Sequence, residues 1–298
     1  MKKMLFVMNP YAGTRKANKY LAEILEIFNR AEYQVTVHMT AGPMDAKRTV
    51  ARLGAEVDLV VCCGGDGTFN ETISGILEQG YTTPIGYIPA GSTNDFAASL
   101  HLPTDILKAA RLCVTGRTVP CDVGVFGKRF FSYVASFGVF TRASYATPQS
   151  AKNALGHLAY VLESIQELSQ LKKTHARFAL ADGTVIEDDF LFGAISNSTS
   201  VGGVLSLDPR QVDMHDGKLE ILLIRVPRDF SELADCLRKL QRQEYNCAMM
   251  TFLSTERVVV ETEDALNWTL DGEWEQGSAL TEVICVQDAI RIRQEERT

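Results

Sequence analysis

The chain has 298 residues, of which 46% are hydrophobic and 22% are charged, with a formal net charge of −7. This length predicts roughly two domains, and the hydrophobic content excludes an intrinsically disordered chain. No apolar run approaches the ~18 residues that span a bilayer, and the acidic balance disfavours nonspecific nucleic-acid binding as the main task.

The first third of the chain alternates between strand and helix patterns. Strands are expected at Met4–Met8, Gln34–Met39, Leu59–Cys63 and Pro84–Ile88, and helices at Asn18–Phe28, Ala46–Leu53 and Asp105–Cys113. Leu59–Cys63 is apolar throughout, which is typical of a parallel strand covered on both faces. Because strands and helices alternate, the sequence predicts an α/β domain with a parallel sheet at 1–120. Met4–Met8 fits a first strand better than a signal peptide.

The pattern changes near Cys121. Hairpins are expected at 123–136, around Gly127–Lys128, and at 176–195, around Asp182–Gly183. A helix is expected at 154–171, and further strands at 219–226, 257–261, 268–270 and 283–286. The sequence therefore predicts a mainly antiparallel β domain at 121–285, with 286–298 returning to the first domain. The seven cysteines include no C-x-x-C pair, which favours a reduced, cytoplasmic protein over a zinc or disulfide framework.

The strongest motif is Gly64–Glu71, between a buried strand and an amphipathic helix. Thr68 and Glu71 fit a capping box, so a helix is expected to begin directly after the glycine turn. Glycines let backbone amides approach a phosphate, and a helix N-terminus attracts an anion. The glycine spacing alone favours the simpler interpretation, a tight strand–helix turn with a good cap. Asp66 favours the phosphate interpretation, because a carboxylate beside a phosphate requires a cation.

Two further turns follow predicted strands. Pro89–Phe96 carries a second candidate capping box, Ser92 with Asp95, and Asn9–Gly13 follows the first strand. If the strands are parallel, all three turns emerge at one edge of the sheet, where ligands bind in open α/β folds. The P-loop and G-x-G-x-x-G patterns do not occur. The convergence of the turns therefore predicts a nucleotide site of another kind.

The three turns resemble those of the diacylglycerol kinase catalytic-domain family, and most closely its soluble bacterial lipid kinases. Gly-Gly-Asp-Gly-Thr alone also occurs in NAD kinases and phosphofructokinases, whereas Asn70–Glu71 and Asn94–Phe96 favour the lipid kinases. The segments Asn197–Gly203, Pro209–Leu219 and Leu270–Glu273 resemble later motifs of the same family. The resemblance implies a fold like that of NAD kinases and diacylglycerol kinases, with 121–285 as the lipid-substrate domain.

The resemblance implies an ATP-dependent lipid kinase that uses Mg²⁺ and converts diacylglycerol to phosphatidic acid. The implied nucleotide contacts are Asn9, Pro10, Tyr11, Ala12, Gly13, Thr40, Gly64, Gly65, Asp66, Gly67, Thr68, Phe69, Asn70, Gly91 and Ser92. Asp66 and Asp95 would organise Mg²⁺, and Glu273 would be the general base, facing the triphosphate from the other domain. Asp213, Asp216 and the carbonyl of Lys218 would hold a structural Mg²⁺.

Several alternatives stay open at this point. One is a soluble-substrate kinase of the NAD kinase type, and another is a nucleotide-binding protein without turnover. On pattern alone Asp216–Gly217 and Asp271–Gly272 fit ordinary hairpin turns. The resemblance implies peripheral membrane contact and allows a homodimer, while the net negative charge disfavours a nucleic-acid partner. The basic candidates for membrane contact are Lys172, Lys173, Arg177, Arg238, Lys239 and Arg242, although charged faces are more often simply solvated.

Overall fold

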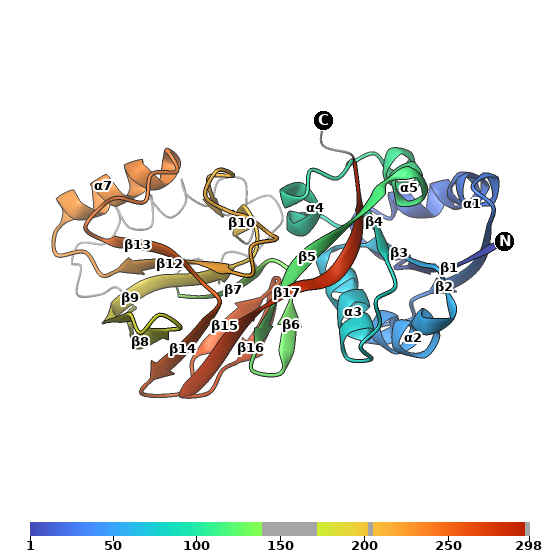
Figure 1. The fold of residues 1–298 in the computed structure, drawn as a ribbon. Coiled ribbons are helices and arrows are strands. Elements are labelled where there is room, and N and C mark those ends of the chain that lie inside the picture. Colours follow the sequence, from blue (N-terminus) through green and yellow to red (C-terminus); the bar gives the residue numbers. More distant parts are fainter. Residues whose placement is uncertain (139–171, 202–204, 296–298) are drawn as a thin grey trace. The chain divides into compact units, whose positions relative to one another are not determined.

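The computed structural model describes residues 1–138, 172–201 and 205–295 (Figure 1). The chain divides into two compact units, one comprising Met1–Cys121 and Asp288–Thr298, the other Asp122–Gln287. The sequence placed these boundaries after residues 120 and 285. Two strands, β5 (Arg117–Phe126) and β17 (Leu280–Gln294), begin in one unit and end in the other. The helix predicted at 154–171 lies outside the described residues.

The first unit is built on a parallel sheet. Its strands β1 (Lys2–Met8), β2 (Tyr33–Met39), β3 (Leu59–Gly64) and β4 (Ile85–Pro89) lie in the order β4-β3-β1-β2. All three pairings are parallel, so the four strands end at the same edge. The last part of β17 joins β4, also in parallel, through Ile292 and Ile85. The predicted parallel α/β fold is therefore confirmed.

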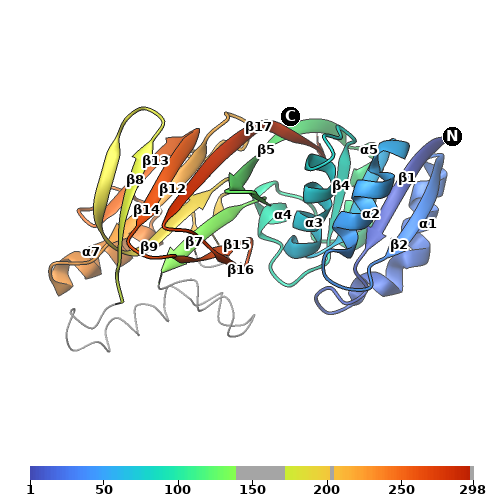
Figure 2. The ribbon, with the colours of Figure 1, turned by 90° about the horizontal axis from the view of Figure 1, so that it is seen from below.

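Helices cover both faces of this sheet. They are α1 (Leu21–Arg30), α2 (Asp45–Leu53), α3 (Asp66–Leu77), α4 (Asp95–Ser99) and α5 (Ile106–Thr115), with 3₁₀ turns at Lys16–Tyr20 and Gly54–Glu56. Figure 1 shows α1 and α5 above the strands and α2 and α3 below them, and Figure 2, seen from below, brings α2 and α3 toward the viewer. Because both faces are covered, β3 is buried at every residue.

The second unit is an antiparallel β structure. Its strands are β6 (Arg129–Phe131), β7 (Val134–Gly138), β8 (Thr174–Leu180), β9 (Val185–Ser196), β12 (Leu219–Arg225), β13 (Met250–Thr255), β14 (Arg257–Thr262), β15 (Asn267–Leu270) and β16 (Glu273–Gln276). A short pair, β10 (Ser200–Val201) and β11 (Leu205–Ser206), and the helix α7 (Phe230–Gln241) complete it. All described pairings among these strands are antiparallel. The predicted mainly antiparallel β domain is confirmed.

The core of the second unit is aromatic. Trp268 is fully buried and contacts Phe126 and Phe137 edge-on, with ring centroids 5.0 Å apart in both pairs. On the other side of the structure, α7 lies beside β12 and β13 (Figure 1) and buries Leu233, Cys236 and Leu240. The apolar face of α7 that these three residues form is therefore part of a core. Among the described residues, no helix has both the length and the apolar content that crossing a bilayer requires.

Two predicted strand boundaries were wrong. The sequence placed one strand at 129–136, but it is broken at Ser132–Tyr133 into β6 and β7. The break arises because the backbone N–H groups at this point donate to the Asp271 carboxylate instead of to a neighbouring strand. The strand predicted at 283–286 is much longer, since β17 continues from the second unit into the first.

Candidate functional site

The turns that follow β1, β3 and β4 pack against one another backbone to backbone. A Cβ atom on Gly91 would lie 2.5 Å from the Cα of Gly65, and one on Gly13 would lie 2.5 Å from the carbonyl oxygen of Ala90. Gly13 also has φ +50°, a conformation that glycine adopts without strain. Because Gly13, Gly65 and Gly91 have no side chains, the three turns lie closer together at this edge of the sheet than turns with a Cβ atom at these positions could.

Two asparagine side chains hold this frame. Asn9 donates from Nδ2 to the Thr68 hydroxyl over 3.0 Å and accepts at Oδ1 from the Tyr11 N–H over 2.9 Å. Asn94 accepts from the Gly91 N–H over 2.8 Å and donates to the Gly91 carbonyl over 3.1 Å. Asn9 thus links the turn after β1 to the first turn of α3. Asn94 stabilises the turn after β4 through hydrogen bonds within that turn.

Both predicted capping boxes were wrong. Helix α3 begins at Asp66, two residues before Thr68, and its N-cap residue is Gly65, which has no side chain. Glu71 lies in the middle of α3 and caps α2 instead, accepting the N–H groups of Met44 over 2.7 Å and Ala46 over 3.2 Å. A helix N-terminus without a side-chain cap from its N-cap residue is a suitable place for an anion.

Asp66 caps a neighbouring helix in the same way. Its side chain is buried and accepts the N–H groups of Asp95 over 3.2 Å and Phe96 over 3.3 Å, at the start of α4. The second predicted box failed because α4 begins at Asp95, after Asn94 in the left-handed region, so Ser92 lies outside the helix. The sequence predicts a cation beside Asp66, whereas in the structure the positive end of α4 is a partner for its charge. The two acids predicted to act together, Asp66 and Asp95, do lie side by side.

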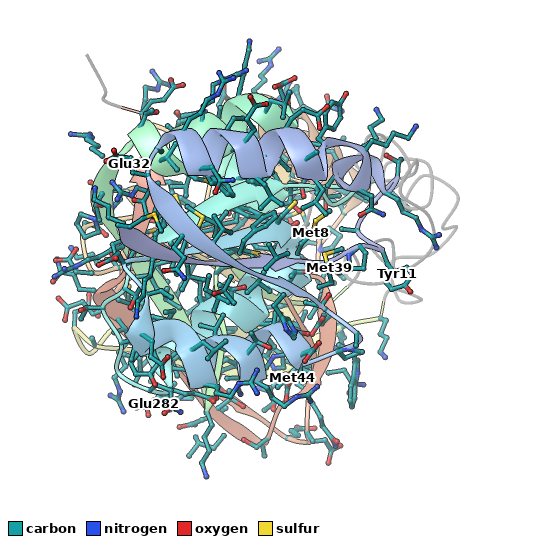
Figure 3. All side chains as sticks on the ribbon, turned by 90° about the vertical axis from the view of Figure 1, so that its right-hand side faces the viewer. Met8, Tyr11, Glu32, Met39, Met44 and Glu282 are labelled. Atoms are coloured by element: carbon teal, nitrogen blue, oxygen red, sulfur yellow. The ribbon has the colours of Figure 1, made fainter. Side chains whose placement is uncertain are left out.

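The segment after β2 forms the rim of this edge. The Thr40 N–H donates to the Met8 carbonyl over 2.8 Å, and the Thr40 side chain is buried. Figure 3 shows Tyr11, Met39 and Met44 on the same side of the first unit, and all three side chains are exposed. They give the rim an apolar character that the sequence did not reveal, because each belongs to a different element.

In the second unit, Asp271 and Gly272 form the two-residue turn between β15 and β16, with φ +49° and +83°. The hairpin interpretation of this pair is confirmed. The Asp271 carboxylate is buried and accepts four hydrogen bonds, from the N–H groups of Ser132, Tyr133 and Val134 and from the Ser132 hydroxyl, at 2.6–3.1 Å. Burial raises the pKa of Asp271, and these donors oppose that rise.

Asp271→Asn is expected to destabilise the second unit. Each carboxylate oxygen accepts two hydrogen bonds, so either orientation of the amide places its NH₂ group against two donors. An unpaired buried donor costs about 1–3 kcal/mol. Chemical denaturation followed by tryptophan fluorescence measures the loss, since Trp268 lies in this unit's core. Asp182→Asn, in the exposed β8–β9 turn, is the control. Equal stabilities of the two variants would contradict the role given to Asp271.

Glu273 begins β16 and is exposed, with 59% of its side chain accessible. Arg129 bridges it to Glu275, with 2.5 Å from the guanidinium to each carboxylate. The pairing orients the carboxylate that the sequence assigned as general base. The partner itself could not be found from sequence, because Arg129 lies more than 140 positions away.

The predicted metal ligands lie in the loop before β12. Asp216 accepts the Lys218 N–H over 2.9 Å, and Asp213 accepts the His215 N–H over 3.0 Å. Two buried acids that sequence reasoning missed are close by. Asp122 accepts the Gly217 N–H over 2.8 Å, and burial together with the charge of Asp216 raises the pKa of Glu220 to about 8. Glu220 is the one acid in β12 and stands between Leu219 and Ile221, a signal that was available in the sequence.

The Asp213–Lys218 loop is the predicted site of a structural cation. Within the described ranges, no three acidic, histidine or cysteine side chains are arranged to ligate one ion. The predicted ligands provide only two such side chains, Asp213 and Asp216, together with the carbonyl of Lys218. The Glu220 Oε2 atom is buried and has no hydrogen-bond partner in the described structure, and a hard cation prefers such oxygen donors. The residues present therefore fit a hydrated divalent cation at this loop.

Comparisons with known proteins agree with this architecture. Residues 3–126 match the profile of the diacylglycerol kinase catalytic domain, and residues 133–293 match that of the YegS C-terminal NAD kinase beta sandwich-like domain. The chain is 31% identical over 280 residues to a diacylglycerol kinase of Bacillus subtilis (strain 168), covering 92% of this chain and 90% of that protein.

Further similarities extend this result. A diacylglycerol kinase of Staphylococcus carnosus (strain TM300) is 28% identical over 275 residues, covering 92% of this chain and 89% of that protein. The crystal structure of a diacylglycerol kinase from Bacillus anthracis str. Sterne superposes with a TM-score of 0.78 at 20% identity, over 99% of this chain and 97% of that one. The structural similarity shows a common fold.

Proposed function

The chain belongs to the diacylglycerol kinase family, and from this membership we propose that it transfers the γ-phosphoryl group of ATP to a lipid hydroxyl. Diacylglycerol is the proposed acceptor and phosphatidic acid the product. The observation that carries the proposal is the convergence of three glycine turns at the N-terminus of α3.

The first unit is proposed to bind ATP. Its backbone amides at Gly64–Thr68 and Gly91–Ser92 would receive the phosphates, since glycines permit close approach and the N-terminus of α3 attracts negative charge. Asn9–Gly13, Thr40 and Asn70 would complete the contacts. Phe69, also predicted as a contact, is fully buried and stacks on Tyr87 and Phe96, so it would support the turn from beneath. The exposed side chains of Tyr11, Met39 and Met44 provide apolar surface beside this edge, which suits a purine base.

Phosphoryl transfer depends on positioning and charge neutralisation. Mg²⁺, when bound, would supply part of that neutralisation. Asp66 and Asp95 would hold it at the first unit, directly or through water, while Asp66 also fixes the start of α4. Asp213, Asp216 and the Lys218 carbonyl would hold a second, structural Mg²⁺.

Glu273 is proposed as the general base. It would accept the proton of the lipid hydroxyl as that oxygen bonds to the γ-phosphorus and the bond to the β–γ bridging oxygen breaks, leaving ADP. Arg129 would keep the carboxylate in position through its ion pair.

The test is an ATP-consumption assay against a panel of lipid alcohols in detergent micelles, with NAD as a soluble acceptor. Phosphatidic acid formed from diacylglycerol supports the proposal. Phosphorylation of another lipid alcohol would keep the reaction class and replace the acceptor. Phosphorylation of NAD alone would assign a soluble-substrate kinase, and ATP binding without any turnover would assign a nucleotide-binding protein. Either of the last two results overturns the proposal.

A further inference from the structure

One buried carboxylate of the second unit has an oxygen that no described residue satisfies. Glu220 lies in β12, where its neighbours Leu219 and Ile221 face the hydrophobic core and the Glu220 side chain projects from the opposite face. The residue is 1% exposed, and its Oε2 atom has no partner within the described structure. A buried carboxylate oxygen without a partner is costly, so a group that satisfies this atom is expected.

The charged groups that act most strongly on Glu220 are themselves carboxylates, those of Asp216, Asp213 and Asp122. The loop brings them close because the Gly217 N–H donates to Asp122 and the Lys218 N–H donates to Asp216. Such an arrangement of like charges is relieved either by a proton on Glu220 or by a cation nearby, and a divalent cation with oxygen ligands supplies the second.

A second side chain independently points to the same place. Asn197 is fully buried and donates from Nδ2 to the Asp122 carbonyl over 2.6 Å, while its Oδ1 has no partner among the described residues. The amide orientation is determined, because a carbonyl oxygen can only accept. Asn197 is linked to the Asp213–Lys218 loop through Asp122, which donates its N–H to the Met214 carbonyl and accepts the Gly217 N–H. The unsatisfied oxygens of Asn197 and Glu220 are both acceptors that a bound water satisfies.

We infer that Glu220 and Asn197 accept hydrogen bonds from the water molecules of a hydrated Mg²⁺ held at the Asp213–Lys218 loop. Mg²⁺ keeps several of its waters when it binds a protein, so buried acceptors behind the direct ligands determine how tightly it is held. The inference rests on the proposed function for the identity of the cation as Mg²⁺.

The experiment is calorimetric titration of the full chain, stripped with a chelator, with Mg²⁺ and separately with Ca²⁺ at one fixed pH. Glu220→Gln is expected to weaken Mg²⁺ binding about 10- to 100-fold, the usual cost of losing an outer-sphere partner. Ca²⁺ binding should weaken less, because Ca²⁺ takes more of its ligands directly from protein oxygens. Asp216→Ala should weaken both cations. Glu244→Gln, the same change at an exposed position of the same unit, should bind like the unaltered chain.

Glu220→Asp is the second variant, since it keeps the charge and withdraws the oxygen by one methylene. Weakened Mg²⁺ binding in this variant supports the inference even if Glu220→Gln fails to fold. Mg²⁺ affinities equal to that of the unaltered chain in every Glu220 variant that folds would overturn it, as would equal losses for the two cations. A chain that binds Mg²⁺ in this manner but phosphorylates no acceptor would overturn the proposed function and leave the inference standing.

Discussion

Glu273→Gln is expected to lower phosphorylation of a lipid hydroxyl by about 10²- to 10⁴-fold, the usual contribution of a general base. Glutamine keeps the size of the side chain and can still accept a hydrogen bond from Arg129, but it cannot take the proton of the attacking hydroxyl. ATP binding and the free energy of unfolding should stay close to those of the unaltered chain, since Glu273 is exposed. Initial rates at saturating ATP and lipid measure the effect.

Glu275→Gln is a closely matched control. Glu275 lies two residues along the same strand and pairs with the same guanidinium over 2.5 Å. If the loss of activity came only from disturbing Arg129, the two variants would be impaired alike. A general base at position 273 predicts that Glu275→Gln retains most of its turnover. Near-full activity of Glu273→Gln would remove that residue from the base role.

Gly91→Ala is expected to disrupt the nucleotide edge of the first unit. Its Cβ would lie 2.5 Å from the Cα of Gly65 and 2.7 Å from the Oδ1 of Asn94, and the Gly65 backbone cannot move aside as a flexible side chain would. Separating the two turns should weaken ATP binding at least tenfold. Overpacking of this kind typically costs about 1–3 kcal/mol of stability. Calorimetric ATP titration and thermal unfolding measure the two effects.

Gly42→Ala provides the comparison. Gly42 lies in the segment after β2, near Thr40, and a Cβ there would meet nothing within 4 Å. This variant should bind ATP as the unaltered chain does and should be equally stable. Unchanged ATP affinity in Gly91→Ala would contradict the proposal that close packing of the turns builds the nucleotide site.

The regular alternation of strand and helix patterns in the first third of the chain made the α/β architecture of the first unit predictable. Leu59–Cys63 is apolar at each position, and β3 is buried at each position because helices cover both faces of the parallel sheet. The Asp271–Gly272 turn could also be predicted, since two residues with positive φ favour this pair. Because such features depend on residues that are adjacent in the sequence, a local sequence pattern is enough to predict them.

Helix capping could not be predicted in the same way. The spacing of Thr68 and Glu71 matched a local capping box, yet Glu71 caps α2 and Asp66 caps α4. The physical reason is that a carboxylate satisfies any helix N-terminus within reach, and packing decides which one that is. A sequence motif specifies the acid but not its partner.

Residues far apart in sequence completed the environments of the other acids. Arg129 pairs with Glu273, the Ser132–Val134 backbone surrounds Asp271, and Asn197 is held against Asp122. By itself, the sequence determined which turns contain glycines, which contain acids, and which strand precedes each of these turns. Only the tertiary structure decided which charges are buried, which are paired and which retain an unsatisfied oxygen, because burial and pairing arise from contacts between elements that no local pattern encodes.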